Sequence, residues 1–569
     1  MEKIKVVIVN KQKTVKIPTG VRLLMRRCCH AVLELENFQG SAEVDISLVD
    51  NQQIREINKE QRNIDMVTDV LSFPLGENGQ TMKCKKILTA LLAAACTMSG
   101  CHGDLDIMQD NKLSASNMWI DESDAETATY GIYLYMRDAL KSVHDIYLCW
   151  GEFRNGLWGA GTNKTLSGVD QTQVRTSTMS SSNAYADWSV MYKTVNQANL
   201  ILKHVPEMGI SESVRNFSLG NAYFSRAWCY FWIARIWGDA PLALTGYEST
   251  GGDLYLPRAP KAEIFARIES DLTEAERYVT DNSDKAVATP AAVQMLKADY
   301  ALWMYRVAGG GSSYLTMAEK AIEALNLSAS RLESDYAQVF SSANKLNKEV
   351  IFAVHQANGE AVNGPGYYLG WNSNYVEAAY QNNPVPITGG NQWWWYTDRY
   401  KALLTSVEGD TRTKLTYNRA DYGTTIKSIE WTEKGVGQMI SGARIFDSDF
   451  ILYRYAEAFL MDAEIKYYRK DYGGALTALG EITKRAYGNA AHYTDQSDAA
   501  VKRAIVEESL KELVGEGRTW WTLIRLDAVW DYNKDVADKR ESNANILLWP
   551  ITQESIIKNS KLKQTEGWY

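Results

Sequence analysis

Hydrophobic residues recur at helical spacing over most of the chain. Residues 188–204 carry apolar side chains at three- and four-residue intervals, which predicts an amphipathic helix. Residues 215–237 are apolar nearly all round and predict a buried helix that ends at Gly238-Asp-Ala-Pro241. Thr289 followed by Pro290 predicts a capped helix start. Further helices are expected over 263–279, 290–307, 314–325, 335–340, 450–469, 474–487 and 499–514.

The predicted helices follow one another in pairs. Each pair takes up about 35–45 residues, a spacing typical of tetratricopeptide-like stacking, although the strict repeat consensus is not met. The sequence therefore predicts a mainly α fold over residues 102–569. Helix pairs form its scaffold, and long non-helical stretches leave that scaffold as loops.

The first 81 residues have a different pattern. Residues 3–9 and 42–49 are typical of strands, and residues 21–35 and 51–62 are typical of helices. This order predicts a short α/β segment. All 18 tryptophans and all 32 tyrosines lie after residue 118, so we expect residues 1–81 to be a domain separate from the body.

Residues 82–101 have the organisation of a secretory signal peptide. Three lysines are followed by an apolar run of about ten residues and then by small residues that end in Cys101. Met98-Ser-Gly-Cys101 matches the lipoprotein cleavage pattern, so we expect acylation of Cys101, with Cys96 as a weaker candidate. Two or more acyl chains give stable membrane anchoring. The functional product is expected to begin near Met82.

Charge and cysteine content narrow the range of functions. The net charge is −8, and the acidic residues responsible lie after residue 101, which argues against a nucleic-acid partner for the body. Only Cys149 and Cys229 follow Cys101, too few for a disulfide framework. We expect no cofactor and no metal.

One motif group lies in the first segment. Residues 48–62 and 68–74, the latter reading Thr-Asp-Val-Leu-Ser-Phe-Pro, resemble the amino-terminal half of the YbeY endoribonuclease family. That family holds zinc with an H-x-x-x-H-x-x-x-x-x-H run, and no two of the six histidines here have this spacing. Without metal ligands nothing activates water. We therefore expect residues 1–81 to be an inactive, truncated fragment.

A second motif group extends over residues 101–569. It includes Trp188/Tyr192/Asn196/Asn199, Arg226-Ala-Trp228, Trp237-Gly-Asp-Ala-Pro-Leu242, the stretch from Arg454 to Glu464, and Trp549-Pro-Ile551. With these motifs the chain resembles the SusD/RagB family of outer-membrane nutrient-binding lipoproteins. The resemblance implies a surface-exposed, lipid-anchored protein of the outer membrane. It also implies that the protein binds oligo- or polysaccharide and passes it to a TonB-dependent SusC-like transporter.

Charged residues within these motifs are expected to serve the scaffold. Arg226, Arg454, Glu457 and Glu464 lie in apolar helical stretches, where long side chains pair and bury their stems. We therefore interpret them as structural ion pairs rather than ligand contacts.

Two non-helical stretches combine aromatic residues with glycine and asparagine. Sugar rings present apolar C–H faces that stack on aromatic rings, and aromatic residues in loops are often exposed for binding. The sequence predicts ligand contacts in residues 149–163 and in a second region formed by residues 363–372 and 389–396. The candidates are Trp150, Arg154, Trp158, Tyr368, Trp371, Asn391, Trp393, Trp394 and Trp395.

Other functions remain open at this point. Peptide capture is the alternative that the RagB branch of the family implies. An enzyme is a second alternative, either the ribonuclease of the first segment or a glycoside hydrolase, which needs two carboxylates at a set separation. A helical scaffold without a small ligand is a third.

Overall fold

The computed structural model describes residues 4–12, 25–26, 29, 42–67, 118–143, 146–161, 168–249, 254–357, 359, 364–390 and 392–568. The chain divides into two compact units, residues 1–109 and 110–569. Among the described residues, no helix is both long enough and apolar enough to cross a membrane.

The first unit contains the α/β elements that the sequence predicts. Strands β1 (Ile4–Asn10) and β2 (Ala42–Leu48) pair in parallel, and helix α2 (Asn51–Arg62) follows them. Asp50 caps this helix by accepting a hydrogen bond from the Gln53 N–H at 2.9 Å. The helix expected over 21–35 lies largely outside the described residues.

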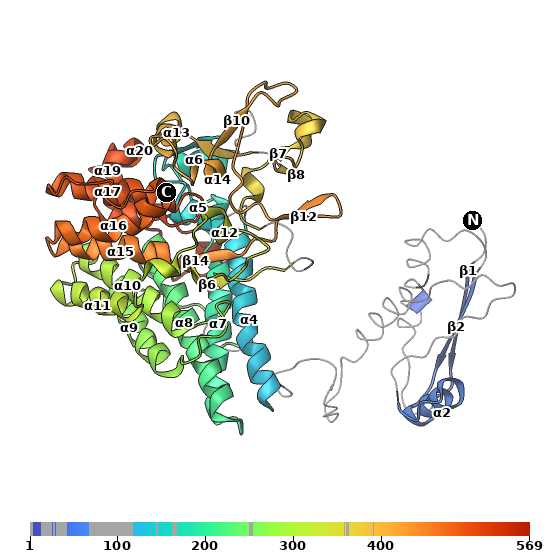
Figure 1. Cartoon of the computed structure of the whole chain (residues 1–569). Helices are drawn as coiled ribbons and strands as arrows, with labels where there is room; N and C mark the ends of the chain where they lie inside the picture. The colour runs from blue at the N-terminus through green and yellow to red at the C-terminus, as the bar shows by residue number, and fades with distance from the viewer. Residues whose placement is uncertain are drawn as a thin grey trace. The chain divides into compact units, whose positions relative to one another are not determined.

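Helices dominate the second unit. Neighbours in sequence pack side by side, as the pairs α8/α9, α10/α11 and α15/α16 show (Figure 1). The mainly α prediction is therefore correct. The helices of this scaffold are α4 (Glu122–Lys141), α5 (Ile146–Gly151), α7 (Ser189–His204), α8 (Glu212–Trp237), α9 (Lys261–Tyr278), α10 (Pro290–Arg306), α11 (Ser312–Ala324), α15 (Tyr455–Tyr468), α16 (Tyr472–Tyr487), α17 (Asp498–Glu512) and α18 (Thr519–Arg525).

Local sequence signals explain where these helices begin and end. Gly238 ends α8 at φ 73°, a backbone conformation that favours glycine. Thr289 caps α10 by accepting a hydrogen bond from the Ala292 N–H at 3.2 Å, with Pro290 at the first helical position. Both signals were identified in the sequence, and both predictions are confirmed.

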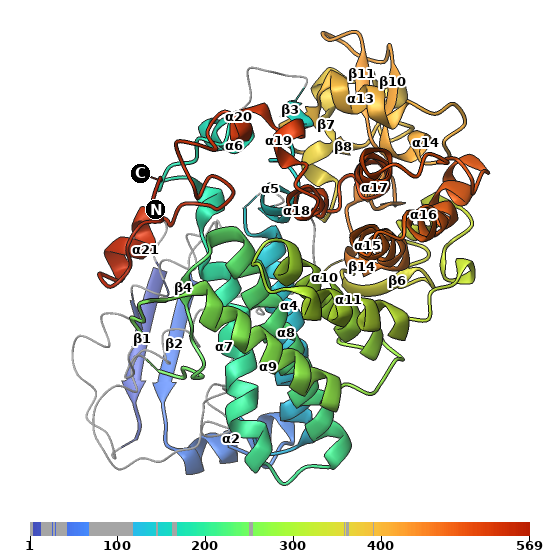
Figure 2. The ribbon, with the colours of Figure 1, turned by 90° about the vertical axis from the view of Figure 1, so that its left-hand side faces the viewer.

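The helix expected over 450–469 is wrong at its start. Residues Phe450–Arg454 form strand β14, which pairs antiparallel with β6 (Val350–Val354), and α15 begins only at Tyr455. A continuous apolar run cannot distinguish a buried strand from a buried helix by periodicity alone. Figure 2 shows this strand pair directly beside α15.

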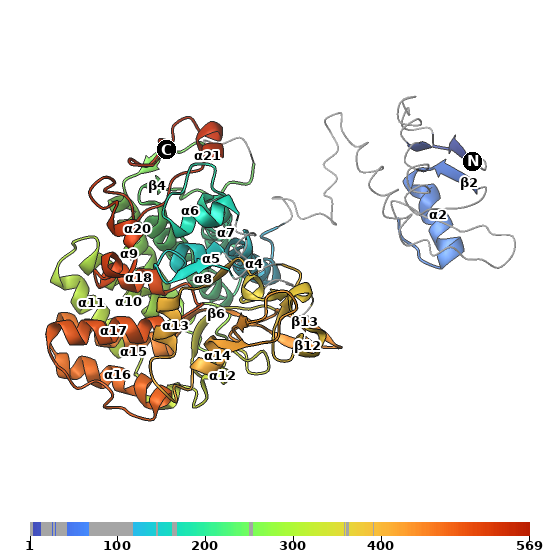
Figure 3. The ribbon, with the colours of Figure 1, turned by 90° about the horizontal axis from the view of Figure 1, so that it is seen from above.

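Between β6 and β14 the chain leaves the scaffold and returns; residues 364–449 are called the excursion below. It contains three short strand pairs, β7 with β8, β10 with β11 and β12 with β13, and the hairpin β12–β13 projects from the unit (Figure 3). Trp371, Val376, Val385, Ile429 and Trp431 form a small hydrophobic cluster inside it. The strands are β7 (Trp371–Asn372), β8 (Ile387–Thr388), β10 (Asn418–Ala420), β11 (Ile429–Trp431), β12 (Gln438–Ile440) and β13 (Ala443–Ile445).

Buried ion pairs connect the helices to one another. Arg226 of α8 binds Asp271 of α9 at 2.7 Å, and both side chains are buried. Glu457 and Glu464 bind the guanidinium groups of Arg518 and Arg525 at 2.8 and 3.0 Å. The structural interpretation of these motif residues agrees with this geometry.

Candidate functional site

A strand pair joins the two aromatic stretches identified in the sequence. Strand β3 (Trp158–Ala160) pairs antiparallel with β9 (Trp394–Tyr396), with Trp158 opposite Tyr396 and Ala160 opposite Trp394. Gly161 makes the approach possible, because a Cβ atom there would lie 1.6 Å from the Gln392 carbonyl oxygen. The structure thus brings together segments that are more than two hundred residues apart in the chain.

Most of the predicted contact residues lie inside the fold. Six side chains are buried, and five of them donate hydrogen bonds to protein acceptors at 2.5–3.2 Å. Their expected exposure is wrong, because four of the tryptophans pack into the main hydrophobic core of the unit and Trp371 packs into the small cluster inside the excursion. These six are Trp150, Arg154, Trp158, Trp371, Trp394 and Trp395.

Arg154 is a buried side chain that makes structural contacts. Its guanidinium donates to the carbonyl oxygens of Ile546 and Leu547 at 2.5 and 3.1 Å, and it lies over the rings of Trp520 and Trp549. Burial lowers the pKa of Arg154 to about 9. The side chain therefore binds the carboxy-terminal segment and is buried rather than exposed to solvent.

Two buried carboxylates organise the aromatic cluster. Glu152 accepts hydrogen bonds from the Gly515 and Gly517 N–H groups, each at 2.8 Å, and from Trp158 Nε1 at 3.2 Å. Burial raises the pKa of Glu152 to about 7. Glu430 accepts from Trp395 Nε1 at 2.7 Å and pairs with Lys401 at 2.8 Å. Neither carboxylate was predicted from the sequence, because Gly515 and Gly517 are far from Glu152 in the chain and Trp395 is far from Glu430.

Tyr368 and Trp393 are the predicted contacts that remain partly exposed. Their ring centroids are 6.4 Å apart, and Tyr367 lies edge-on to Tyr368 at 4.9 Å. Gly389 and Gly390 pass close to the two tyrosine rings, where added Cβ atoms would lie 3.1 and 3.6 Å from Tyr367. Residues Tyr367, Tyr368 and Trp393 are called the aromatic edge below. Asn391, Cys96 and Cys101 lie outside the described residues.

A second aromatic surface in the excursion was not identified from the sequence. Tyr380 and Tyr422 stack with centroids 3.7 Å apart and planes 15° apart, and both are half-buried. Trp431 packs behind Tyr422 at 5.8 Å. The two tyrosines come from different strand connections, so no local sequence pattern would have placed them together.

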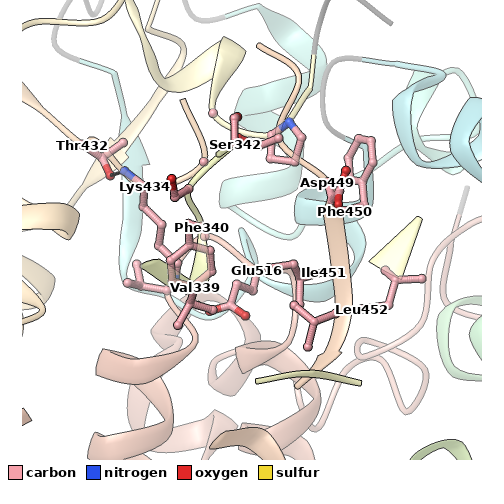
Figure 4. Close-up of a pocket in the computed structure, with 18 of the residues that line it drawn as sticks. Val339, Phe340, Ser342, Thr432, Lys434, Asp449, Phe450, Ile451, Leu452 and Glu516 are labelled. Atoms are coloured by element: carbon pink, nitrogen blue, oxygen red, sulfur yellow. Dashed lines mark hydrogen bonds and ion pairs between the residues drawn. The ribbon is translucent and has the colours of Figure 1, made fainter. Parts of the chain in front are cut away.

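A cavity of about 50 Å³ lies under the excursion. Its wall is formed by segments of the excursion, the turn after α12 (Tyr336–Val339), the start of β14 and the Gly515–Glu516 turn. Figure 4 shows Lys434 and Asp449 on different sides of it, with Phe340 between them. Lys434 is already engaged, since it donates to Glu516, to the Tyr336 hydroxyl and to the Glu512 carbonyl.

These elements together suit recognition of a polar molecule that contains a ring. The aromatic edge offers flat apolar surfaces, and the nearby cavity offers polar groups in a defined arrangement. Binding sites typically combine these two features.

Comparison with known proteins extends this picture. Residues 160–303 match a family model described as "Starch-binding associating with outer membrane", and residues 411–568 match the SusD family model. Residues 7–115 match the YbeY endoribonuclease model, a range that includes the expected signal peptide. The two resemblances found in the sequence are therefore confirmed.

Individual relatives agree with these matches. A SusD-like protein of Formosa agariphila is 21% identical over 514 residues, which cover 83% of this chain and 97% of the relative. The YbeY endoribonuclease of Acetivibrio thermocellus is 50% identical over 68 residues, 12% of this chain. This chain spans only 42% of that relative's length.

Solved structures share the fold of the second unit. A SusD superfamily protein from Bacteroides fragilis is 26% identical, with a TM-score of 0.68 over 79% of this chain and 100% of that protein. Surface glycan-binding protein A from Bacteroides thetaiotaomicron, solved with laminarihexaose, is 18% identical, with a TM-score of 0.63 over 78% of this chain and 99% of that protein. The body of this chain belongs to the SusD family, and a segment similar to YbeY precedes it.

Proposed function

We propose that this chain is a cell-surface protein that binds glycans and delivers them to a TonB-dependent SusC-like transporter for nutrient uptake. The observation that carries the proposal is the partly exposed aromatic edge beside a polar cavity on a SusD scaffold. Aromatic faces hold sugar rings through their apolar C–H surfaces. The starch-binding description of the matching family and the laminarihexaose held by a structural neighbour support a carbohydrate ligand.

The proposed role is binding without catalysis. Glu152 and Glu430, the carboxylates beside the aromatic cluster, both accept hydrogen bonds from N–H groups of the fold. A glycoside hydrolase needs one carboxyl group as acid and a second one as nucleophile or base next to the bond that breaks. Release of shorter glycans by the purified chain alone would contradict this part of the proposal.

Membrane attachment through Cys101 is part of the same proposal. The lysine-rich start, the apolar run and Met98-Ser-Gly-Cys101 support it. Labelled palmitate is expected to enter the wild-type chain and not the Cys101→Ala variant in the native host. A membrane-bound product that still carries residues 1–81, detected by mass spectrometry, would contradict a start near Met82.

Affinity electrophoresis against a set of polysaccharides tests the binding function. The wild-type chain is expected to be retarded by at least one of them. Retardation by none, together with binding to peptides, would favour the peptide-uptake alternative instead.

Removal of the partly exposed Trp393 is the matching test of the site. Trp393→Ala is expected to weaken binding of the retained glycan roughly tenfold, because a central tryptophan commonly contributes more than 1 kcal/mol to an interface. Trp530→Ala is the control, since Trp530 is half-buried on α19 (Val529–Tyr532), outside the excursion. Titration calorimetry measures both variants. Equal affinities for the two variants would place the site elsewhere.

A further inference from the structure

Two aspartates beside the cavity differ in how their oxygens are used. Asp447 is fully engaged: Ser342 Oγ donates to Oδ1 at 2.9 Å, and Gln438 Nε2 donates to Oδ2 at 2.7 Å. Lys345 Nζ lies 3.3 Å from the same Oδ2. Asp447 therefore holds the surrounding loops together and has little capacity left for a ligand.

Asp449, which lines the cavity, keeps one oxygen unused. Its Oδ1 accepts the Gln356 N–H at 3.0 Å and lies 3.0 Å from His355 Nδ1. Its Oδ2 is buried and has no hydrogen-bond partner within the described part of the chain, and its side chain is 4% exposed. A buried carboxylate oxygen without a donor is unfavourable. The position therefore favours a donor from outside the fold.

A second unpaired acceptor belongs to Gln356, the residue whose backbone N–H binds this carboxylate. Gln356 is fully buried, and its Nε2 donates to the Ser448 carbonyl at 2.7 Å. Its Oε1 has no partner among the residues that the structure describes. Both unused polar atoms around Asp449 are thus acceptors, which indicates that the missing group is a hydrogen-bond donor.

The charges nearby decide which kind of donor fits. Lys345 Nζ is 3.3 Å from Asp447 and 3.8 Å from Asp449, and it also donates to the Gln356 and Asp447 carbonyl oxygens at 2.5 Å each. This ammonium group already supplies the positive charge between the two carboxylates and would repel a second cation. A neutral hydroxyl group donates a hydrogen bond without that repulsion.

The size of the cavity agrees with a small group. Its volume of about 50 Å³ exceeds the roughly 10–15 Å³ that a cavity needs to hold one water molecule, and it is smaller than the roughly 150 Å³ of a cavity that holds a benzene ring. A single hydroxymethyl or ring hydroxyl group fits this space, while the rest of the sugar stays outside.

We propose that Asp449 is a specificity-determining residue that accepts a hydrogen bond from one hydroxyl group of a bound glycan, with Gln356 beside it as a second acceptor. This inference rests on the proposed function. It goes beyond stacking on the aromatic edge, because an acceptor in a small cavity distinguishes sugars by the position of a free hydroxyl. A buried polar group left without its partner is what gives such discrimination.

Calorimetric titration of the full chain with laminarihexaose, maltohexaose, cellohexaose and xylohexaose first identifies a probe that binds. Asp449→Asn is expected to weaken that probe about tenfold or more. Asp421→Asn removes the same charge from an exposed position of the excursion and is expected to leave affinity unchanged. Equal affinity of Asp449→Asn and the wild type would overturn the inference.

A second measurement separates recognition from local damage to the fold. Deoxy analogues of the bound probe, each lacking one hydroxyl, are titrated into both proteins. One analogue is expected to bind the wild type about tenfold more weakly than the parent sugar does. In Asp449→Asn, removal of the same hydroxyl is expected to lower the affinity little further. Independent, additive losses would contradict a direct contact. If neither the four hexaoses nor any polysaccharide in the electrophoresis set binds the wild type, the proposed function itself fails, and the inference fails with it.

Calcium chloride alone tests the cation alternative. We expect no change in the melting temperature of the wild-type chain in the millimolar range. A rise that Asp449→Asn abolishes would show a cation at this position and overturn the hydroxyl assignment.

Discussion

Arg454→Met is expected to lower the free energy of unfolding by about 3–5 kcal/mol. Arg454 binds Glu349 and Glu512 through Nη1 at 2.9 and 2.6 Å, and it binds Glu516 through Nε at 2.7 Å. All four side chains are buried. Methionine preserves the apolar stem and removes the charge, so several carboxylates lose a partner in a region of low dielectric constant.

The surrounding groups indicate how strongly this cluster depends on its cations. Burial acts to raise the pKa of Glu512, but Arg485, Arg454 and Arg412 outweigh it and hold that pKa well below its usual range. Arg469→Met is the control, since Arg469 pairs with Glu319 at 2.8 Å at a partly exposed position. Its expected cost is at most about 1 kcal/mol. Urea unfolding of the full chain measures both variants, and similar costs would contradict the buried network.

Asp299→Asn is expected to have a comparable effect, about 3–5 kcal/mol. The Asp299 carboxylate accepts from three guanidinium groups, those of Arg235, Arg518 and Arg525, at 3.1, 2.8 and 3.0 Å. Arg518 and Arg525 each have a second carboxylate partner, whereas Arg235 lies among aromatic rings, with Phe231 3.9 Å away. In Asp299→Asn, Arg518 and Arg525 therefore keep a carboxylate partner, whereas Arg235 loses the one that it has in the wild type.

The same residue gives the protein a defined response to acid. Burial acts to raise the pKa of Asp299, but the three arginines outweigh it and hold the pKa well below the usual value of 3.8. A lowered folded-state pKa means that the contribution is present above pH 3.8 and is lost as the pH falls below it. As the pH falls from 5 to about 2, the free energy of unfolding of Asp299→Asn is expected to decrease less than that of the wild type. The control is Asp462→Asn, whose pair with Lys466 is partly exposed.

If the free energy of unfolding fell in parallel with pH for the wild type and Asp299→Asn, the acid response would not come from Asp299. That result would mean that Asp299 binds its proton equally well in the folded and the unfolded chain. Urea unfolding at fixed pH values supplies the free energies. Asp462→Asn is expected to follow the wild type throughout.

Sequence patterns were sufficient for features that depend on neighbours in the chain. The buried helix ending at Gly238 and the capped start at Thr289-Pro290 need only local geometry and local hydrogen bonds. Helix α4 carries a similar local signal, a capping box between Asp121 and Asp124, which the sequence reading overlooked.

Long-range pairing explains what the sequence did not reveal. Phe450–Arg454 is a strand because β6, about one hundred residues earlier, lies beside it. Trp158 and Trp394 are buried because β3 and β9 pair, and nothing in either segment indicates its partner. Of the predicted contacts, Tyr368 and Trp393 stay partly exposed, whereas the prediction of exposure was wrong for the six buried side chains.

A crystal structure of the full chain with its bound oligosaccharide would show whether the aromatic edge and Asp449 contact the sugar. The account predicts a sugar ring against Trp393 and Tyr368, with one hydroxyl directed toward the cavity and Asp449. Sugar bound instead at the surface hollow formed by Lys203, Tyr247 and Glu248, with the aromatic edge unoccupied, would contradict it.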